Sequence, residues 1–293
     1  MCVAHRFGRS GKRISSQQSR HLACQAKRNL SKRVGFTLIE LLVVISIIAL
    51  LIAILLPVLQ RVRKQVKAVV CQTNLRQWGT TLDLYVEENR GRLPSVFDSV
   101  LFLRGSFISE DDPNENAEEP LNPIYTKGIA CCPMAVKSSG RSLWGTTFEA
   151  WETRFYGPLF CCSYGFNQQL LSVESVHPHT QELLSPNVFL LKNKAQFPVL
   201  LDCKRPHHIV KDYEEPPQIE SERSWIEWGS FCMNRHNGYI NGLFLDWSVR
   251  KVGLKELWTL KWDSDFDTTN PWTKAGGVQP EDWPEWMRRF KDY

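Results

Sequence analysis

One long apolar run near the amino terminus limits what this chain can fold into. Residues 36–56 are 21 consecutive positions with a single charge, Glu40, and two hydroxyls, Thr37 and Ser46. A helix rises about 1.5 Å per residue, so the run would be about 31 Å long, which matches the roughly 30 Å hydrocarbon core of a bilayer. We therefore expect residues 36–56 to form a transmembrane helix. Because a carboxylate inside a membrane is costly, Glu40 must have a specific role.

The positive charge of the chain is confined to the segment before this run. Residues 1–35 contain nine lysines and arginines and no acidic residue, whereas the whole chain has a net charge of +5, so residues 36–293 carry −4. The positive-inside rule then predicts that residues 1–35 stay in the cytoplasm and the rest is exported, although four basic residues between 61 and 67 oppose that orientation. Nucleic-acid binding would need the positive charge on the folded part, so we expect no nucleic-acid partner.

The start of the apolar run carries a specific motif. Residues 35–42 read Gly-Phe-Thr-Leu-Ile-Glu-Leu-Leu, and no cleavage site of the ordinary secretory type follows the run. This stretch resembles the amino terminus of type IV pilins and pseudopilins. The resemblance implies that a prepilin peptidase cuts after Gly35 and that the new amino terminus, Phe36, is methylated. It also implies that Glu40 pairs with the amine of a neighbouring subunit in a filament. The alternative is an uncleaved single-pass anchor.

The helix is predicted to continue well beyond the apolar run. After Pro57, apolar residues recur mostly three or four positions apart as far as Val86, which is the spacing of an amphipathic helix. Pro57, which the pilin family also carries, is expected to kink the helix without ending it. Gly91 and Pro94 indicate the end. The predicted parts are a leader (1–35), a transmembrane helix (36–56), an extramembrane half-helix (57–91) and an exported domain (92–293).

The exported part is long enough for one sizeable core. Short apolar segments between Gly, Pro, Asn and Asp predict strands at 188–191, 199–202, 242–246 and 248–252, the last two forming a hairpin. Acidic, proline-rich stretches at 110–124 and 211–222 predict surface loops, and the amphipathic segments 254–260 and 280–290 predict short helices. The fold class is therefore α+β, with a long amino-terminal helix packed on a mainly antiparallel sheet.

A second motif lies near the hairpin. Residues 234–247 resemble the H-x9-D-G ending of pseudopilin-related proteins of planctomycetes and their relatives, with His236 and Asp246 at the right spacing and Trp247 in place of the glycine. Cys132-Pro133 and residues 163–167 also resemble this group. The role of the motif is poorly defined in that family. One interpretation is a hydrogen bond or salt bridge between His236 and Asp246 that fixes the hairpin; a surface site or metal ligation is the other.

Seven cysteines follow the leader, namely Cys71, Cys131, Cys132, Cys161, Cys162, Cys203 and Cys232. An exported domain can oxidise, so disulfides are predicted among the last six of these cysteines, including links between the two vicinal pairs. The number is odd, and Cys71 on the helix is expected to be left out. Free buried thiols are an alternative. A zinc site at the vicinal pairs is another, although they lack the gap typical of structural zinc ligands.

Three carboxylates alternate at Asp263, Asp265 and Asp267. An EF-hand loop uses this spacing, but Thr268 and Lys274 stand where it needs a glycine and a glutamate, so an EF-hand is excluded. Because major pseudopilins of type II secretion carry calcium in a carboxyl-terminal loop, the resemblance keeps a looser calcium site open. A solvated acidic turn is the alternative, and no other cofactor is expected.

The carboxyl-terminal segment is rich in aromatic residues, with six tryptophans from Trp247 to Trp286. They are expected to cover the sheet as part of the core, or else to form a partner surface that stacks on ligands. Because the sequence lacks the nucleophile-elbow, P-loop, zincin and Rossmann patterns, we expect no enzyme. The sequence thus predicts a pseudopilin-like subunit of the bacterial inner membrane, assembled with like or related subunits into a type II secretion filament or a pilus. The competing hypothesis is an anchored binding protein that does not polymerise.

Overall fold

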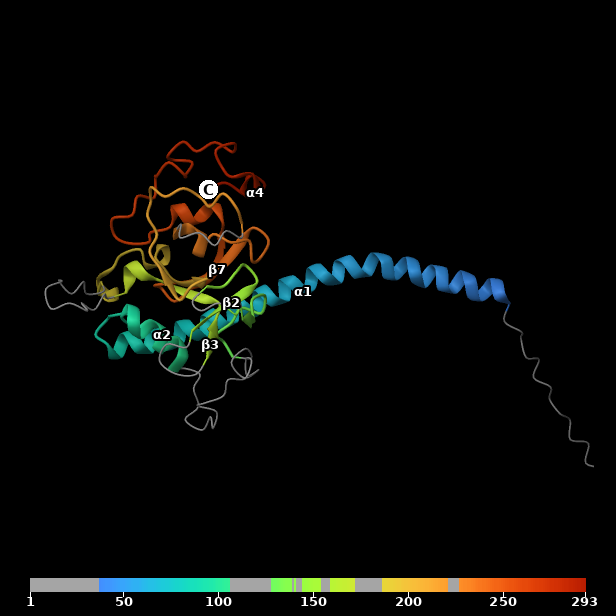
Figure 1. Cartoon of the computed structure of the whole chain (residues 1–293), viewed down its shortest axis with the longest axis horizontal. Helices are drawn as coiled ribbons and strands as arrows, with labels where there is room; N and C mark the ends of the chain where they lie inside the picture. Colours follow the sequence, from blue (N-terminus) through green and yellow to red (C-terminus); the bar gives the residue numbers. More distant parts are fainter. Residues whose placement is uncertain are drawn as a thin grey trace, which may run out of the picture. The chain divides into compact units, whose positions relative to one another are not determined.

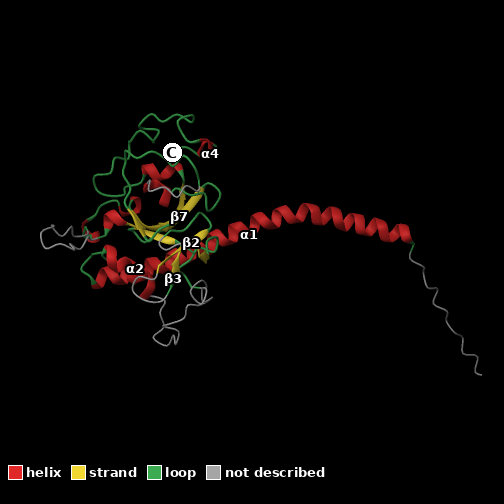
Figure 2. Cartoon of the chain, in the orientation of Figure 1, coloured by secondary structure: helices red, strands yellow, loops and turns green. Residues whose placement is uncertain are grey.

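The computed structural model describes residues 37–105, 128–138, 140, 144–153, 159–171, 186–220 and 227–293. The leader, with Gly35 and Phe36, and the predicted loop at 110–124 lie outside the described residues. The chain divides into two units, Met1–Ala53 and Ile54–Tyr293. Figure 1 follows the elements from the blue amino-terminal helix to the red carboxyl-terminal segment, and Figure 2 separates helices, strands and loops.

Helix α1 (Leu38–Glu88) is 51 residues long and runs through Pro57 without ending. Its apolar side chains are exposed from Leu38 to Val66. Among the described residues, α1 is the helix that is long and apolar enough to cross a membrane. An 18-residue window of this helix has a mean hydropathy of 3.3, and no part of the window is buried. The long predicted helix is therefore confirmed, and the kink at Pro57 stays a prediction.

The second part of α1 buries one face against the rest of Ile54–Tyr293. Buried residues follow the three- and four-residue spacing predicted for it: Ala68, Cys71, Leu75, Trp78, Leu82 and Val86. Gly79 lets the helix approach the sheet closely, because a Cβ at this position would lie 2.9 Å from Leu243 Cδ1. The helix ends at Glu88 rather than at 91, and the first residue with a left-handed backbone is Arg90 (φ 57°), followed by Gly91 (φ 81°).

The described residues form two sheets. The smaller sheet has the order β1-β2-β3, and the larger one has the order β6-β4-β5-β7-β8. Neighbours are antiparallel except β1–β2 and β4–β6, which are parallel. The strands are β1 (Lys137–Ser138), β2 (Glu149–Thr153), β3 (Phe160–Cys162), β4 (Tyr164–Asn167), β5 (Pro198–Asp202), β6 (His207–His208), β7 (Tyr239–Phe244) and β8 (Val249–Gly253). The predicted α+β class with a mainly antiparallel sheet and a β7–β8 hairpin is confirmed.

The remaining helices of the described residues are short. They are α2 (Val96–Gly105), α4 (Glu285–Arg288), η1 (Gln168–Leu170), η2 (Val188–Leu190), η3 (Lys194–Gln196), η4 (Glu227–Ser230) and η5 (Lys255–Thr259). The strand predicted at 188–191 is wrong: Asn187 accepts a hydrogen bond from the amide of Phe189 and starts the 3₁₀ turn η2. Helix α2 was not predicted from the sequence; it begins with a capping bond from the amide of Asp98 to Ser95 Oγ at 3.1 Å.

The central strand β5 is buried along its whole length because both faces of the sheet are covered. Leu200 belongs to one core cluster with α1 residues such as Leu75, and Leu201 belongs to a second cluster with Trp258 and Trp262. Helix α1 therefore covers one face of the sheet and the carboxyl-terminal segment covers the other. The prediction that the tryptophans of this segment serve as core is confirmed for these two and for Trp283, which are at most 1% exposed.

Candidate functional site

The first candidate site is the start of α1, around Glu40. The amide and the hydroxyl of Thr37 each donate a hydrogen bond of 2.8 Å to Glu40 Oε2, and the amide of Glu40 donates one of 3.2 Å to Thr37 Oγ1. This is a capping box, which satisfies backbone donors at the helix start. The carboxylate thus has a partner within its own chain. The Thr37-x-x-Glu40 spacing indicates this capping box, although it was not predicted above.

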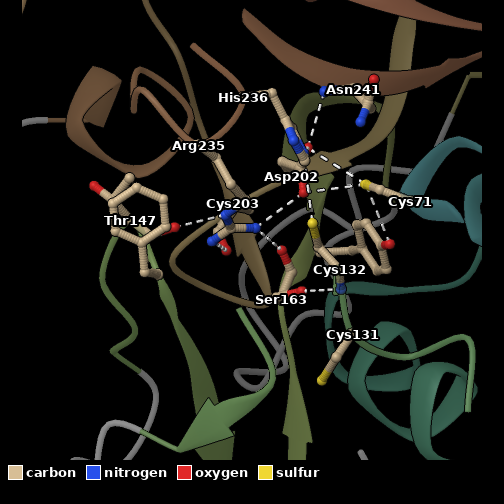
Figure 3. A network of polar contacts seen from close by, with 12 residues as sticks. Cys71, Cys131, Cys132, Thr147, Ser163, Asp202, Cys203, Arg235, His236 and Asn241 are labelled. Atoms are coloured by element: carbon tan, nitrogen blue, oxygen red, sulfur yellow. Dashed lines mark hydrogen bonds and ion pairs between the residues drawn. The ribbon is translucent and has the colours of Figure 1, made fainter. Parts of the chain in front are cut away.

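The second candidate site is a buried polar cluster centred on Asp202, which we call the Asp202 network (Figure 3). It comprises Cys71, Cys132, Asp202, Arg235, His236 and Asn241. Asp202 ends strand β5 and is fully buried. Its Oδ1 accepts from Arg235 Nη1 at 3.0 Å, and its Oδ2 lies 3.1 Å from His236 Nε2. Oδ2 also accepts from the backbone amide of Asn241 at 2.9 Å.

Arg235 is saturated with partners. Its Nε donates to the carbonyl of Thr147 at 2.8 Å, and its Nη1 donates to the carbonyl of Ser163 at 2.7 Å in addition to Asp202. Its Nη2 reaches the carbonyls of Thr146 and Cys203 at 3.3 and 3.4 Å. A buried guanidinium is tolerated when it is paired and fully hydrogen-bonded, and here both conditions are met.

Two thiols complete the network. Cys71 Sγ, from helix α1, lies 3.5 Å from Asp202 Oδ1 and accepts from the hydroxyl of Tyr164 at 3.4 Å. Cys132 Sγ, from the loop before β1, lies 3.4 Å from His236 Nε2. Figure 3 shows both cysteines and His236 directed toward Asp202. Asn241 adds a second link to the helix, because its side chain accepts from Gln72 Nε2 at 2.9 Å.

The electrostatics of the network favour charged partners. Burial raises the pKa of Asp202, but His236 and Arg235 outweigh this and hold that pKa well below its usual range. Burial lowers the pKa of His236, but Asp202 outweighs it and raises the value to about 9. Burial also raises the pKa of Cys132, while hydrogen bonds from Cys71 and His236 bring it down to about 7. Burial raises the pKa of Cys71 well above its usual value.

The cysteines are not joined in pairs. All seven are buried free thiols, so the structure contains none of the disulfides predicted among Cys131, Cys132, Cys161, Cys162, Cys203 and Cys232. The physical reason is that vicinal cysteines point to different surroundings. Cys131 Sγ donates to the carbonyl of Cys161 at 3.5 Å, whereas Cys132 faces His236, and Cys162 Sγ donates to the carbonyl of Ala130 at 2.9 Å.

The structure does not join His236 to Asp246, so the predicted bond between them is wrong. His236 precedes strand β7 and is buried beside Asp202, whereas Asp246 is exposed in the turn after β7. Asp246 Oδ1 accepts instead from the amide and hydroxyl of Ser248, at 3.0 and 2.6 Å. Trp247 has φ 60°, the left-handed conformation that favours the glycine of the related motif.

Two of the three alternating carboxylates, those of Asp263 and Asp267, stabilise local turns. Asp263 Oδ1 accepts from the amide of Asp265 at 2.8 Å, and Asp267 Oδ1 accepts from the amide of Thr269 at 2.7 Å. Among the described residues, the potential metal ligands whose donor atoms converge within 4.8 Å are Cys71, Cys132, Asp202 and His236, and not these aspartates. Calcium binding at Asp263, Asp265 and Asp267 stays a prediction.

The central residues of the Asp202 network were not predicted from the sequence. The sequence motifs singled out His236 and Cys132, but not Asp202, Arg235 or the link to Cys71. One signal was available, because a single carboxylate ends the apolar strand 199–202 and a buried charge requires partners. The partners themselves lie between 33 and 131 residues from Asp202, and no local pattern marks them.

One part of the chain matches a known family of sequences. Residues 31–56 match the model of the prokaryotic N-terminal methylation motif. No curated protein and no solved structure matches the chain. The matched segment includes Gly35, Phe36 and Glu40, and with the single long apolar helix it is consistent with a single-pass membrane anchor. The motif supports a pilin-like subunit, and it ends before the part of α1 that packs on the sheets.

Proposed function

We propose that this protein is a non-enzymatic, pseudopilin-like subunit of a type II secretion filament or a related pilus. The observation that carries the proposal is the methylation motif at residues 31–56, with Glu40 as the one charge in the apolar run of helix α1. In this proposal a prepilin peptidase cuts after Gly35 in the bacterial inner membrane, and the domain beyond the helix is exported. The apolar half of α1 then packs with the same half of other subunits.

The role proposed for Glu40 is to set the register between neighbouring subunits. Its carboxylate would exchange the Thr37 donors of its own capping box for the methylated amine of a neighbour's Phe36. An ion pair in a low-dielectric filament core offsets the desolvation of both charges, which a lone carboxylate does not. The capping box supports this role because it gives Glu40 partners before assembly, so the free subunit need not bury an unpaired charge.

Two single variants separate assembly from capping. Glu40→Ala removes both the carboxylate and the capping box, whereas Thr37→Ala removes the capping bonds of the hydroxyl and keeps the carboxylate. In cells that assemble the filament, we expect both variants to be cleaved after Gly35 by mass spectrometry. We expect Glu40→Ala to be lost from sheared filaments and Thr37→Ala to remain at near wild-type abundance.

Other outcomes would change the assignment. If both variants disappear from the filaments, Glu40 acts through the helix start and not through an intersubunit pair. If the wild-type chain is cleaved but never enters a filament, the protein is an anchored binding protein. The burial of Trp258, Trp262 and Trp283 argues against that second function, because it removes much of the aromatic segment from the surface available to a ligand.

A further inference from the structure

Four potential metal ligands meet inside the Asp202 network. They are the thiols of Cys71 and Cys132, the carboxylate of Asp202 and the imidazole of His236, and their donor atoms all lie within 4.8 Å of one another. All four residues are buried. They come from helix α1, the loop before β1, the end of β5 and the loop before β7. Segments so far apart in sequence converge here on one point.

The distances between the donor atoms fit a tetrahedral metal ion. Zinc binds nitrogen and oxygen at about 2.0–2.2 Å and sulfur at about 2.3 Å, so the edges of its ligand tetrahedron are roughly 3.3–3.8 Å long. With Asp202 Oδ2 as the carboxylate donor, the corresponding edges here are 3.6 Å from Cys71 Sγ to Asp202 Oδ2 and 3.4 Å from Cys132 Sγ to His236 Nε2. The edge from His236 Nε2 to Asp202 Oδ2 is 3.1 Å. Small shifts would therefore admit the ion.

The donor chemistry selects zinc over the hard cations. Two thiolates and one imidazole suit zinc, whereas calcium and magnesium take oxygen ligands almost exclusively. The charges also balance: two thiolates and one carboxylate carry −3, zinc carries +2, and the guanidinium of Arg235 supplies the remaining +1. A neutral cluster is the arrangement that a fully buried site requires.

The surrounding residues form the outer shell that metal sites need. Arg235 Nη1 and the amide of Asn241 hold the carboxylate of Asp202 at 3.0 and 2.9 Å, and the hydroxyl of Tyr164 donates to Cys71 Sγ at 3.4 Å. Such partners orient the ligands and tune their basicity. Because all four positions of the ion would be occupied by protein atoms and the site is buried, its role would be structural and not catalytic.

We propose that Cys71, Cys132, Asp202 and His236 bind one zinc ion that fastens the second half of helix α1 to the sheets. Cys71 is the helix contribution, and the other three ligands belong to the loops and strand around the end of β5. The ion would oppose the separation of helix α1 from the sheets when a mechanical force acts on the subunit. It would also keep two thiols reduced in an exported domain.

The proposal is tested on the full-length chain purified in detergent. After incubation with zinc and removal of free metal, elemental analysis should find one zinc ion per wild-type chain. Cys71→Ala should lose the ion, and so should Cys132→Ala. Cys232→Ala is the matched control, because Cys232 is an equally buried free thiol in the other core cluster, and it should keep the ion. Cobalt in place of zinc should give the visible absorption bands of a tetrahedral thiolate site in the wild-type chain and in the control.

The unfolding temperature tests zinc binding without a measurement of the metal content. A strong chelator should lower the unfolding temperature of the wild-type chain and of Cys232→Ala, and should leave that of Cys71→Ala unchanged. The proposal is overturned if the wild-type chain binds no zinc, or if the control loses as much zinc as the ligand variants. Mass spectrometry of the untreated chain that finds a Cys71–Cys132 disulfide would also overturn it.

Discussion

At the scale of single residues, Asp202 decides whether the interior of this domain is electrostatically stable. It is a fully buried carboxylate that meets a fully buried guanidinium at 3.0 Å, with His236 on its other oxygen. Breaking such a pair on one side leaves the other charge buried without a counter-ion. This cost is usually larger than the net stabilisation that the intact pair provides.

Asp202→Asn is therefore expected to destabilise the protein by about 3–5 kcal/mol, because Arg235 keeps its charge and loses its counter-ion. The free energy of unfolding is measured by urea titration followed through tryptophan fluorescence, in the presence of a chelator so that metal loss does not contribute. The exposed carboxylate of Glu215 provides the control, since Glu215→Gln should change the stability by less than about 0.5 kcal/mol. Equal effects of the two variants would contradict this account of Asp202.

At the scale of elements, the two halves of helix α1 differ in which of their faces are exposed. The first half is apolar all round and exposed, whereas the second half buries a stripe of residues against the sheets. A helix that buries one stripe is stabilised mainly by the packing of that stripe and only weakly by intrinsic propensity. Neighbouring leucines on opposite faces should therefore differ sharply in importance.

Leu82 and Leu84 make this comparison within one helical turn. Leu82 is fully buried and Leu84 is 62% exposed. Leu82→Ala should lower the free energy of unfolding by about 2–5 kcal/mol, because it removes buried methyl groups and leaves a cavity. Leu84→Ala should change it by less than about 0.5 kcal/mol. The two urea midpoints test this, and a larger loss at Leu84 would mean that this face of α1 is covered in the folded protein.

At the scale of the whole molecule, two neighbouring histidines make the fold sensitive to acid. Burial, together with the charge of Arg205, lowers the pKa of His207 to about 4 and that of His208 to about 3. The unfolded chain binds these protons near pH 6.5. Below pH 6.5 the unfolded state therefore holds more protons than the folded state, and the stability contributed by the neutral imidazoles is lost as the pH falls toward 4 and 3.

Lowering the pH from 7.5 to 5 should cost about 2 kcal/mol at each of His207 and His208, since each pKa unit corresponds to about 1.4 kcal/mol. His236 offsets part of this loss, because its raised pKa makes the folded state bind that proton more tightly than the unfolded state. Urea midpoints at the two pH values measure the loss. A His207→Gln/His208→Gln double variant is the matched comparison and should show a flatter dependence between pH 6.5 and 5. If the wild-type chain and the double variant lose the same stability over this interval, the acid sensitivity arises elsewhere in the protein.

Patterns over a few neighbouring residues were readable from the sequence, and side-chain contacts between distant segments were not. The continuous helix through Pro57, strand β5 and the β7–β8 hairpin follow from apolar spacing and turn residues, which act over a few positions. The helix start at Thr37 was equally local and was overlooked. The strand predicted at 188–191 failed because one side-chain bond from Asn187 to the backbone outweighed a weak β preference.

The amino-terminal part of this protein can be understood from consecutive residues alone: its length and apolarity select a helix that is able to cross a membrane, and residues 31–56 carry the N-terminal methylation motif. Those properties belong to consecutive residues and need no partner. The partners of Asp202, the separation of His236 from Asp246 and the surroundings of the cysteines follow instead from the packing of the folded chain. Each of these depends on how segments tens to more than a hundred residues apart meet in a packed core, where a buried charge is stable only beside partners that no local pattern specifies.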